Sequence, residues 1–267
     1  MAEYLVFRLY GAMASWGEIA TGESRHSSMH PSRSALIGLL GAALGVERVD
    51  EEGQQRLRRS FRFGMKLASA GTLMRDYHTV QVPPQRSKVF YSTRRQELAN
   101  KEDLNAILSS REYRCDSVSI VAVQLCESAA WTLEQTVQAI ERPQFTLYLG
   151  RKSCPPSLPL SPRIVNANTL REALDTPMLS ISWLASRFSS RLKPELELLE
   201  EDPSVAWPMQ DKRTFRPSQA RYYWEEGMEF GDPHRLETVR NDDPLSRSRW
   251  QFLPRREFLY FEGGYPR

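Results

Sequence analysis

Two cations follow a glycine at the end of an alternating apolar segment in residues 142–156, RPQFTLYLGRKSCPP. The FTLYL run has the period-two pattern of a strand with two different faces, and Tyr148 is expected on the polar face. Gly150 lets the backbone approach a ligand closely or adopt a positive φ. Arg151 and Lys152 bring two positive charges to that point. The segment predicts a strand that leads into a phosphate-facing loop, and the alternative is a sheet edge with solvated cations.

A helix expected over residues 31–46, PSRSALIGLLGAALGV, offers a second site for an anion. Pro31 and Ser32 are typical residues of a helix start. Arg33 and Ser34 lie where the first-turn amides and the positive end of the helix dipole are exposed, which suits a phosphate. The alternative is an ordinary capped core helix, which leaves Arg33 unexplained.

Residues 71–113 lose the regular apolar pattern and mix cations with aromatic rings. The motif RDYHTV supplies Arg75, Tyr77 and His78, and further cations and rings follow up to residue 95. On an extended arm such a mixture suits single-stranded nucleic acid, because cations meet phosphates and rings meet bases. A solvated loop is the competing interpretation.

Composition narrows the class of protein. The chain has 267 residues, of which 40% are hydrophobic, enough for one large or two small folded domains. Its net charge of +3 permits an anionic partner. Three scattered cysteines favour a reducing, cytoplasmic setting, and neither an export signal nor an apolar run long enough for a membrane is expected. The absence of phosphate-loop, dinucleotide, metal-spaced and nucleophile motifs argues against a small-molecule enzyme, and we expect no cofactor or metal.

The order of the expected elements predicts an α+β fold. Strand, helix, strand, long arm, strand, helix and strand in succession form the split βαβ pattern of ferredoxin-like and RNA-recognition folds. The chain then divides into a core at 1–156, which includes the arm, and a proline-rich, irregular C-terminal region at 157–267, which ends in a β-like segment. The expected core elements are 4–10, 31–46, 61–69, 71–113, 117–125, 131–141 and the strand within 142–156, and the expected C-terminal elements are helices near 169–174 and 179–188 and the β-like run 255–264.

Six blocks in order carry a resemblance to a known family. They are GAMASWG, PSRSALIGLLGAALG, RDYHTV, REYRCD, YLGRKSCP and LPRREFLYFEGG. In these blocks the chain resembles CRISPR-associated protein family five, a family of the RAMP superfamily with members in the type I-E Cascade surveillance complex. The resemblance covers residues 4 to about 176 and 251–264, with little between 177 and 250. It implies a ferredoxin-like (RRM/RAMP) core with a long β-hairpin thumb at about 71–113.

The resemblance also implies a function. Members of this family hold the 5′ handle of the CRISPR RNA and cap the backbone filament in antiviral defence, so the implied partners are the CRISPR RNA, the backbone and large subunits and, in the assembled complex, target DNA. No catalytic role is expected. The motifs carry over as candidate RNA contacts Arg33, Ser34, Arg75, Tyr77, His78, Arg111, Tyr148, Arg151 and Lys152. Arginines and a helix start hold phosphates, and a tyrosine can stack on a base.

The alternative function is that of a metal-independent endoribonuclease, because relatives in another subtype cleave the precursor RNA themselves. Such cleavage needs a base near a 2′-hydroxyl and a cation for the developing charge. His78 beside Tyr77, with Lys88 nearby in sequence, could supply these groups. The resemblance is to the subtype that leaves cleavage to a separate subunit, which favours the non-catalytic interpretation.

Overall fold

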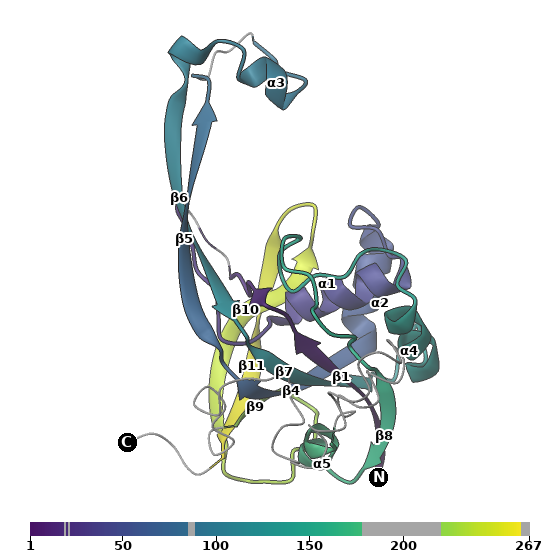
Figure 1. Ribbon diagram of the computed structural model, residues 1–267. Coiled ribbons are helices and arrows are strands. Elements are labelled where there is room, and N and C mark those ends of the chain that lie inside the picture. The colour runs from purple at the N-terminus through teal and green to yellow at the C-terminus, as the bar shows by residue number, and fades with distance from the viewer. Residues whose placement is uncertain (19, 21, 85–88, 178–219, 263–267) are drawn as a thin grey trace, which may run out of the picture.

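The central element of the computed structural model is a seven-stranded antiparallel sheet with the strand order β10-β11-β9-β4-β7-β1-β8 (Figure 1). The structure describes residues 1–18, 20, 22–84, 89–177 and 220–262. The strands are β1 (Ala2–Tyr10), β4 (Phe61–Ser69), β7 (Val118–Leu125), β8 (Arg163–Ala167), β9 (Arg221–Glu225), β10 (Leu236–Ser246) and β11 (Gln251–Phe261). N-terminal and C-terminal strands therefore belong to one sheet.

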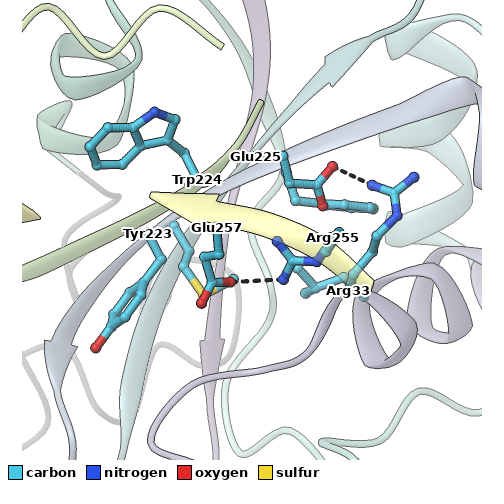
Figure 2. A pocket seen from close by; sticks show the side chains of 9 residues that line it. Arg33, Tyr223, Trp224, Glu225, Arg255 and Glu257 are labelled. Carbon is cyan, nitrogen blue, oxygen red and sulfur yellow. Dashed lines mark hydrogen bonds and ion pairs between the residues drawn. The ribbon is translucent and has the colours of Figure 1, made fainter. Parts of the chain in front are cut away.

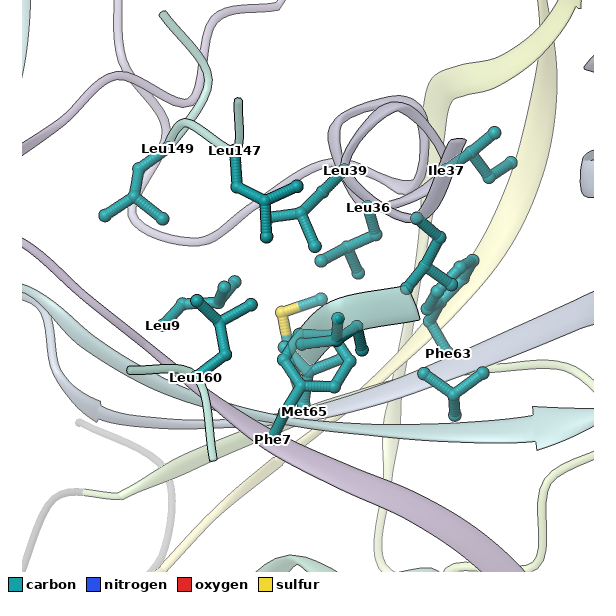
Figure 3. Packing of buried hydrophobic residues seen from close by; sticks show 14 of the residues in the cluster. Phe7, Leu9, Leu36, Ile37, Leu39, Phe63, Met65, Leu147, Leu149 and Leu160 are labelled. Carbon is teal, nitrogen blue, oxygen red and sulfur yellow. The ribbon is translucent and has the colours of Figure 1, made fainter. Parts of the chain in front are cut away.

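Both faces of this sheet are buried. Phe7 of β1 packs on one face against Leu36 of helix α1 (Arg33–Leu44), and helices α2 (Glu51–Ser60) and α4 (Leu133–Glu141) join the same cluster (Figure 3). Val6, the neighbouring residue of β1, belongs to the opposite cluster, which Leu170 of helix α5 (Leu170–Asp175) completes. Because successive side chains of a strand point to opposite faces, two apolar layers require strands that are apolar throughout.

The predicted arm is a long β-hairpin, the thumb, formed by β5 (Thr72–Val82) and β6 (Asn105–Cys115). The register runs without a shift from Thr72 opposite Cys115 to Val82 opposite Asn105. Figure 1 shows the ribbon projecting from the sheet, with α3 (Arg94–Glu97) at its far end, and η1 (Lys101–Asp103) immediately precedes β6. Short strands β2 (Met13–Ala14) and β3 (Ser24–Arg25) pair with β6 near its attachment.

The prediction of a strand within residues 142–156 is wrong. The described backbone there has no strand, and the amides of Gln144 and Phe145 donate to the carbonyls of Ala43 and Ala42 in the last turn of α1. Helix ends leave such carbonyls without helical partners, so the segment satisfies α1 instead of a sheet. The strand that pairs with the outer side of β1 is β8.

The other predicted core elements lie at nearly the observed positions, as does α5, whereas α2 and β8 were not predicted. The C-terminal region is less irregular than predicted, because β9 and β10 join β11 in the sheet. The helix expected at 179–188 lies outside the described residues.

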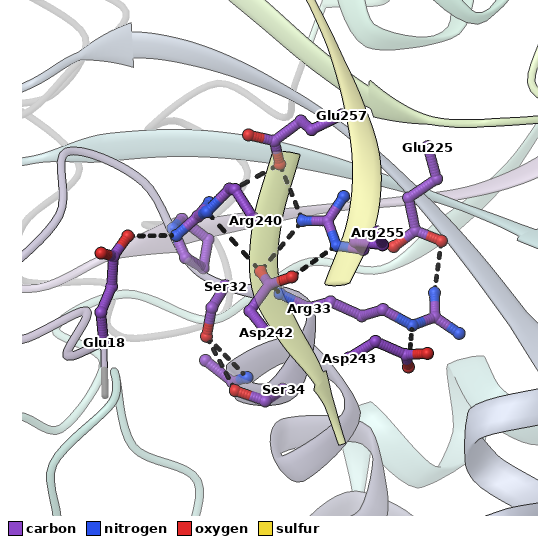
Figure 4. A network of polar contacts seen from close by, with 12 residues as sticks. Glu18, Ser32, Arg33, Ser34, Glu225, Arg240, Asp242, Asp243, Arg255 and Glu257 are labelled. Carbon is purple, nitrogen blue, oxygen red and sulfur yellow. Dashed lines mark hydrogen bonds and ion pairs between the residues drawn. The ribbon is translucent and has the colours of Figure 1, made fainter. Parts of the chain in front are cut away.

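A buried network of charges joins the start of α1 to β9, β10 and β11 (Figure 4). The guanidinium of Arg33 binds the carboxylates of Glu225 and Asp243, with 3.0 Å between Nε and Oδ1 of Asp243. The backbone amide of Arg33 donates to Asp242 (2.8 Å), which also accepts from Arg255 (2.6 Å). Buried charges are tolerated when they are paired in this way, and removing one partner is strongly destabilising.

The pocket in Figure 2 is part of the same network. Its lining includes Arg33, Glu225, Arg255 and Glu257, and the dashed lines show that these groups bind one another. Burial raises the pKa of Glu225, although Arg33 and Arg255 favour its charged form. Each of these four charged side chains is paired with another, although Oε1 of Glu225 and Nη1 of Arg255 have no hydrogen-bond partner of their own. The pocket therefore fastens the C-terminal strands to α1.

His30 makes the stability of this region depend on pH. Its ring lies in the network beside Arg240 and Glu257, and burial, then the charge of Arg240, lower its pKa from 6.5 to about 3. The unfolded chain binds a proton below pH 6.5 that the folded chain does not. Stability therefore falls as the pH drops from 6.5 towards 3, by at most about 1.4 kcal/mol per pH unit.

We expect His30→Gln to remove this contribution. Urea unfolding between pH 6.5 and about pH 5 should give a shallower dependence of the unfolding free energy on pH than in the unmodified chain. His234→Gln, at a histidine whose side chain is 84% exposed, is the control and should leave the slope unchanged. Equal slopes for all three proteins would contradict the role of His30.

Candidate nucleic-acid interface

The base of the thumb is fixed by two loops that are far apart in sequence. The amide of Ser15 donates to the carbonyl of Leu149 (3.0 Å), and the hydroxyl of Ser15 donates to the carbonyl of Glu112 on β6 (3.1 Å). Residues 149–154 form a tight turn, because the amide of Leu149 donates to the carbonyl of Cys154 and that of Cys154 to the carbonyl of Arg151. The loop at Ser15 thus holds both β6 and the turn that carries Arg151.

Gly150 allows this contact. Its φ is +83°, and a Cβ placed there would collide with the carbonyl oxygen of Ser15. The positive φ and the close approach expected at this glycine are both present, but the approaching group is the chain itself and not a ligand. Neighbouring Leu149 is buried in the core, so the turn has a fixed position.

Arg151 and Arg111 lie on one face of the thumb base. The guanidinium of Arg151 stands over the ring of Tyr113, 5.3 Å from its centroid, and Nη1 lies 3.4 Å from the phenol oxygen. Arg111 precedes Tyr113 by two residues on β6 and therefore shares its face. The Nε of Arg111 is buried and has no hydrogen-bond partner among the described residues. Two guanidinium groups are thus presented together.

Tyr148 and Lys152 lie on either side of Arg151 in sequence. Tyr148 is 42% exposed, although its neighbours Leu147 and Leu149 are buried, and Lys152 is exposed. Arg25 of β3 lies opposite Arg111 in the pairing of β3 with β6. The structure places Arg111 and Arg151 beside Tyr113, and Tyr148 and Lys152 lie in the same turn segment as Arg151; we call Arg111, Tyr148, Arg151 and Lys152 the thumb-base cluster.

Arg75 and Tyr77 lie on the opposite face of the ribbon. Arg75 donates to the buried carboxylate of Glu112 (2.8 Å), and this hydrogen bond lowers the pKa of Glu112. Tyr77 is 71% exposed. His78 alternates back to the face of Arg111, where its Nε2 lies 2.8 Å from a carboxylate oxygen of Asp76. The RDYHTV motif is therefore divided between two faces.

Arg33 and Ser34 are not part of the cluster. The Arg33 guanidinium is bound by carboxylates of β9 and β10, so it contacts protein where we expected a phosphate. The amides at the start of α1 already have protein partners. The carboxylate of Asp242 accepts from the amide of Arg33, and the hydroxyl of Ser32 accepts from the amide of Ala35. The hydroxyls of Ser34 and Ser32 lie 3.0 Å apart.

Sequence reasoning missed the role of Tyr113 and of the loop around Ser15. The spacing of Arg111 and Tyr113 in REYRCD was the available signal, since residues two apart in a strand share a face. Trp16 in that loop is a packing anchor, only 3% exposed.

The described residues contain neither a side-chain group suited to a metal ion nor a helix suited to a membrane. Within residues 1–18, 20, 22–84, 89–177 and 220–262, no group of His, Cys, Asp or Glu side chains could hold a metal ion. No helix in the part of the chain that the structure describes is long and apolar enough to cross a membrane. Lys88 lies outside the described residues.

Comparison with known proteins identifies the family. A family model described as CRISPR-associated protein (Cas_Cas5) matches residues 4–257, a range that includes the thumb and most of the sheet. The chain therefore belongs to the CRISPR-associated Cas5 family, and the resemblance seen in the sequence blocks is confirmed.

Individual relatives agree with this assignment. The chain is 33% identical over 182 residues to the CRISPR system Cascade subunit CasD of Escherichia coli K12. The aligned region covers 65% of this chain and 76% of that protein. A solved chain from a CRISPR RNA-guided surveillance complex superimposes with a TM-score of 0.60 at 26% identity, covering 97% of this chain and 90% of that one. A second solved chain, a Cas protein at 21% identity, shares the fold with a TM-score of 0.54 over 97% and 94% of the two chains.

We expect Gly150→Ala to destabilise the thumb base. The substitution forces an alanine into a left-handed conformation and a clash with the Ser15 carbonyl, and we estimate a loss of about 2 kcal/mol or more in unfolding free energy. Gly22→Ala is a matched control, because Gly22 has the same φ of +83° and nothing lies within 4 Å of the added Cβ. Denaturant unfolding should show the larger loss at Gly150, and equal losses would mean that the contact with Ser15 contributes nothing.

Proposed function

We propose that this chain is a non-catalytic RNA-binding subunit of a type I-E Cascade complex, which holds the 5′ handle of the CRISPR RNA and caps the backbone filament in antiviral defence. The observation that carries the proposal is the thumb-base cluster of two guanidinium groups, an ammonium group and a half-exposed phenol. The cluster lies in a Cas5-family chain that is similar to a Cascade subunit and to part of a surveillance complex.

The chemistry of the cluster suits an RNA backbone. Guanidinium groups bind phosphate oxygens through two hydrogen bonds in a fixed geometry. Arg151 is held over the Tyr113 ring before any ligand arrives, so little conformational entropy is lost when it binds. The half-exposed ring of Tyr148 can stack on a displaced base, and 2′-hydroxyls allow RNA to be distinguished from DNA.

The wider assembly is part of the same proposal. Strands β8-β1-β7-β4 would form a ferredoxin-like core, since β1 and β4 run parallel with β7 between them, as in a split βαβ unit. Tyr77, Phe90 and Leu108 of the thumb are 71%, 89% and 55% exposed. Two-stranded ribbons are marginal alone, so these side chains support contact of the thumb with the guide and backbone subunit. We further propose that the chain works in the cytoplasm, in an assembly that also contains the large subunit and, when engaged, target DNA.

Replacing Arg111 and Arg151 together by alanine should weaken binding of a 5′-handle RNA by at least about tenfold, because each charge-assisted contact contributes roughly 1.5–3 kcal/mol. The slope of log affinity against log salt should become shallower by about 1.4 for two lost phosphate contacts on a single strand. Fluorescence anisotropy with a labelled handle RNA measures both quantities.

The matched control replaces Arg56 and Arg59, two exposed arginines of α2, which changes the net charge equally. This control should bind as the unmodified chain does, and all three proteins should unfold at similar temperatures. If the cluster variant and the control bind RNA equally, the thumb-base cluster is not the interface.

The absence of catalysis is tested separately. His78 and Arg111 lie on the same face of the thumb, which supplies a base and a cation for the alternative nuclease function. We nevertheless expect a repeat-containing precursor RNA to stay intact when incubated with the chain, with Mg²⁺ and with a chelator. Gel analysis of end-labelled RNA checks this, and specific cleavage that His78→Ala abolishes would establish the endoribonuclease instead.

A further inference from the structure

The turn between β10 and β11, residues 246–250, lies against α1 and α2. The guanidinium of Arg247 donates to the carbonyl of Ser34 in α1. The guanidinium also lies beside Gly38 of the same helix, where an added Cβ would stand 3.4 Å from Nη2 of Arg247, an ordinary van der Waals distance. The hydroxyls of Ser246 and Ser248 both donate to Glu51 of α2. The turn is thus held in place by both helices, and α1 crosses beneath the Arg247 side chain.

Arg247 differs from the other arginines of this region in having no counter-charge. Arg33 and Arg255 each bind carboxylates in the buried network. Arg247 is half-buried, its Nε has no hydrogen-bond partner, and no described carboxylate forms an ion pair with it. Burial and the neighbouring charge of Arg48 lower its pKa. The carboxylate of Glu51 is bound by Ser246 and Ser248 and forms no ion pair with either Arg247 or Arg48. Two neighbouring cations without an ion pair repel each other, and a bound anion would relieve this cost.

An exposed aromatic ring stands beside these cations. The guanidinium of Arg48 lies over the ring of Trp250, 4.5 Å from its centroid, and Trp250 is 66% exposed. Tryptophan and arginine are among the residue types enriched at binding interfaces. Arginine and tryptophan in contact form the stacking and phosphate-binding pair found in sites for single-stranded nucleic acid.

This group adjoins the thumb-base cluster. Tyr148, a member of that cluster, lies near Arg247. The backbone amides of Gln144 and Phe145 are bonded to α1, so the segment leading to Tyr148 runs along the same helix that Arg247 crosses. The two groups of cations are therefore connected by a surface that contains Tyr148.

We propose that Arg247 and Arg48 bind a backbone phosphate of the RNA and that the exposed ring of Trp250 stacks on one of its bases. This inference rests on the proposed function and extends it: the RNA path continues from the thumb base past Tyr148 and over α1 to the β10–β11 turn. An RNA strand fits better than an acidic peptide, because the site pairs its cations with a large planar ring and continues the thumb-base cluster.

The test uses the full chain and a labelled single-stranded RNA that contains the 5′ handle and adjoining spacer. Arg48→Gln and Arg247→Gln should each weaken binding about tenfold and make the log–log salt slope shallower by about 0.7, the value for one phosphate contact on a single strand. Arg247→Lys should keep the slope. Trp250→Ala should weaken binding about tenfold with the slope unchanged, because stacking releases no counterions.

Arg59→Gln, at an exposed arginine of α2, is the control for net charge, and thermal unfolding checks that each variant is folded. If Arg247→Gln unfolds, Arg48→Gln decides, since Arg48 is exposed. Unchanged binding by both glutamine variants and by Trp250→Ala, while the Arg111 and Arg151 double variant binds weakly, overturns this inference and leaves the proposed function standing. Unchanged binding by all of them overturns both. Tighter binding of polyglutamate than of RNA, lost in the same variants, also overturns the inference in favour of an acidic protein partner.

Discussion

The pairing of buried charges between α1 and the C-terminal strands is the interaction on which the rest of the structure depends. Arg33 links the helix to β9 and β10, and β9 pairs in turn with β4 in the middle of the sheet. Charges buried at this depth are stable only when every partner is present. The network therefore fixes the direction of α1, and α1 supports the segment that ends in Tyr148 and Gly150. The buried ion pairs of Arg33 thus help to determine, through α1, where Tyr148 is placed.

The thumb combines a rigid base with a ribbon that has few contacts. At the base, Ser15 bonds both β6 and the turn at Leu149, while Glu112 binds Arg75 and the amide of Ser27. Beyond the base, most side chains of both strands are exposed. Side chains presented at the base keep one geometry, and the outer part of the ribbon can adapt to a neighbour without disturbing them.

The sequence was sufficient to predict the strands rich in apolar residues, but not the strands that carry buried charges. Strand β1 was predictable because its apolar residues serve two buried faces, and β4 because its apolar residues alternate with Arg62 and Lys66 and pack on one face. The FTLYL run misled because alternation reports alternate burial, which Leu147 and Leu149 have without any strand pairing. Strand β10 was missed because its buried residues include Asp242, whose partners lie in other elements. Arg33 was assigned to a phosphate for the same reason, since its carboxylates are 192 and 210 residues away in sequence. In contrast, Tyr148, Arg151 and Lys152 lie in one short segment that a local pattern reveals, whereas Arg111 was proposed only through the family resemblance of REYRCD.

That long separation sets an order of events during synthesis. The Arg33 guanidinium leaves the ribosome about 10 to 40 s before the strand that carries Asp243, at usual elongation rates of roughly 5–20 residues per second. During this interval β4 lacks its neighbour β9, and its open edge can pair with another chain. A newly made chain thus acquires the strand that covers this edge, and its protection against aggregation, only after β9 at residues 221–225 has been translated.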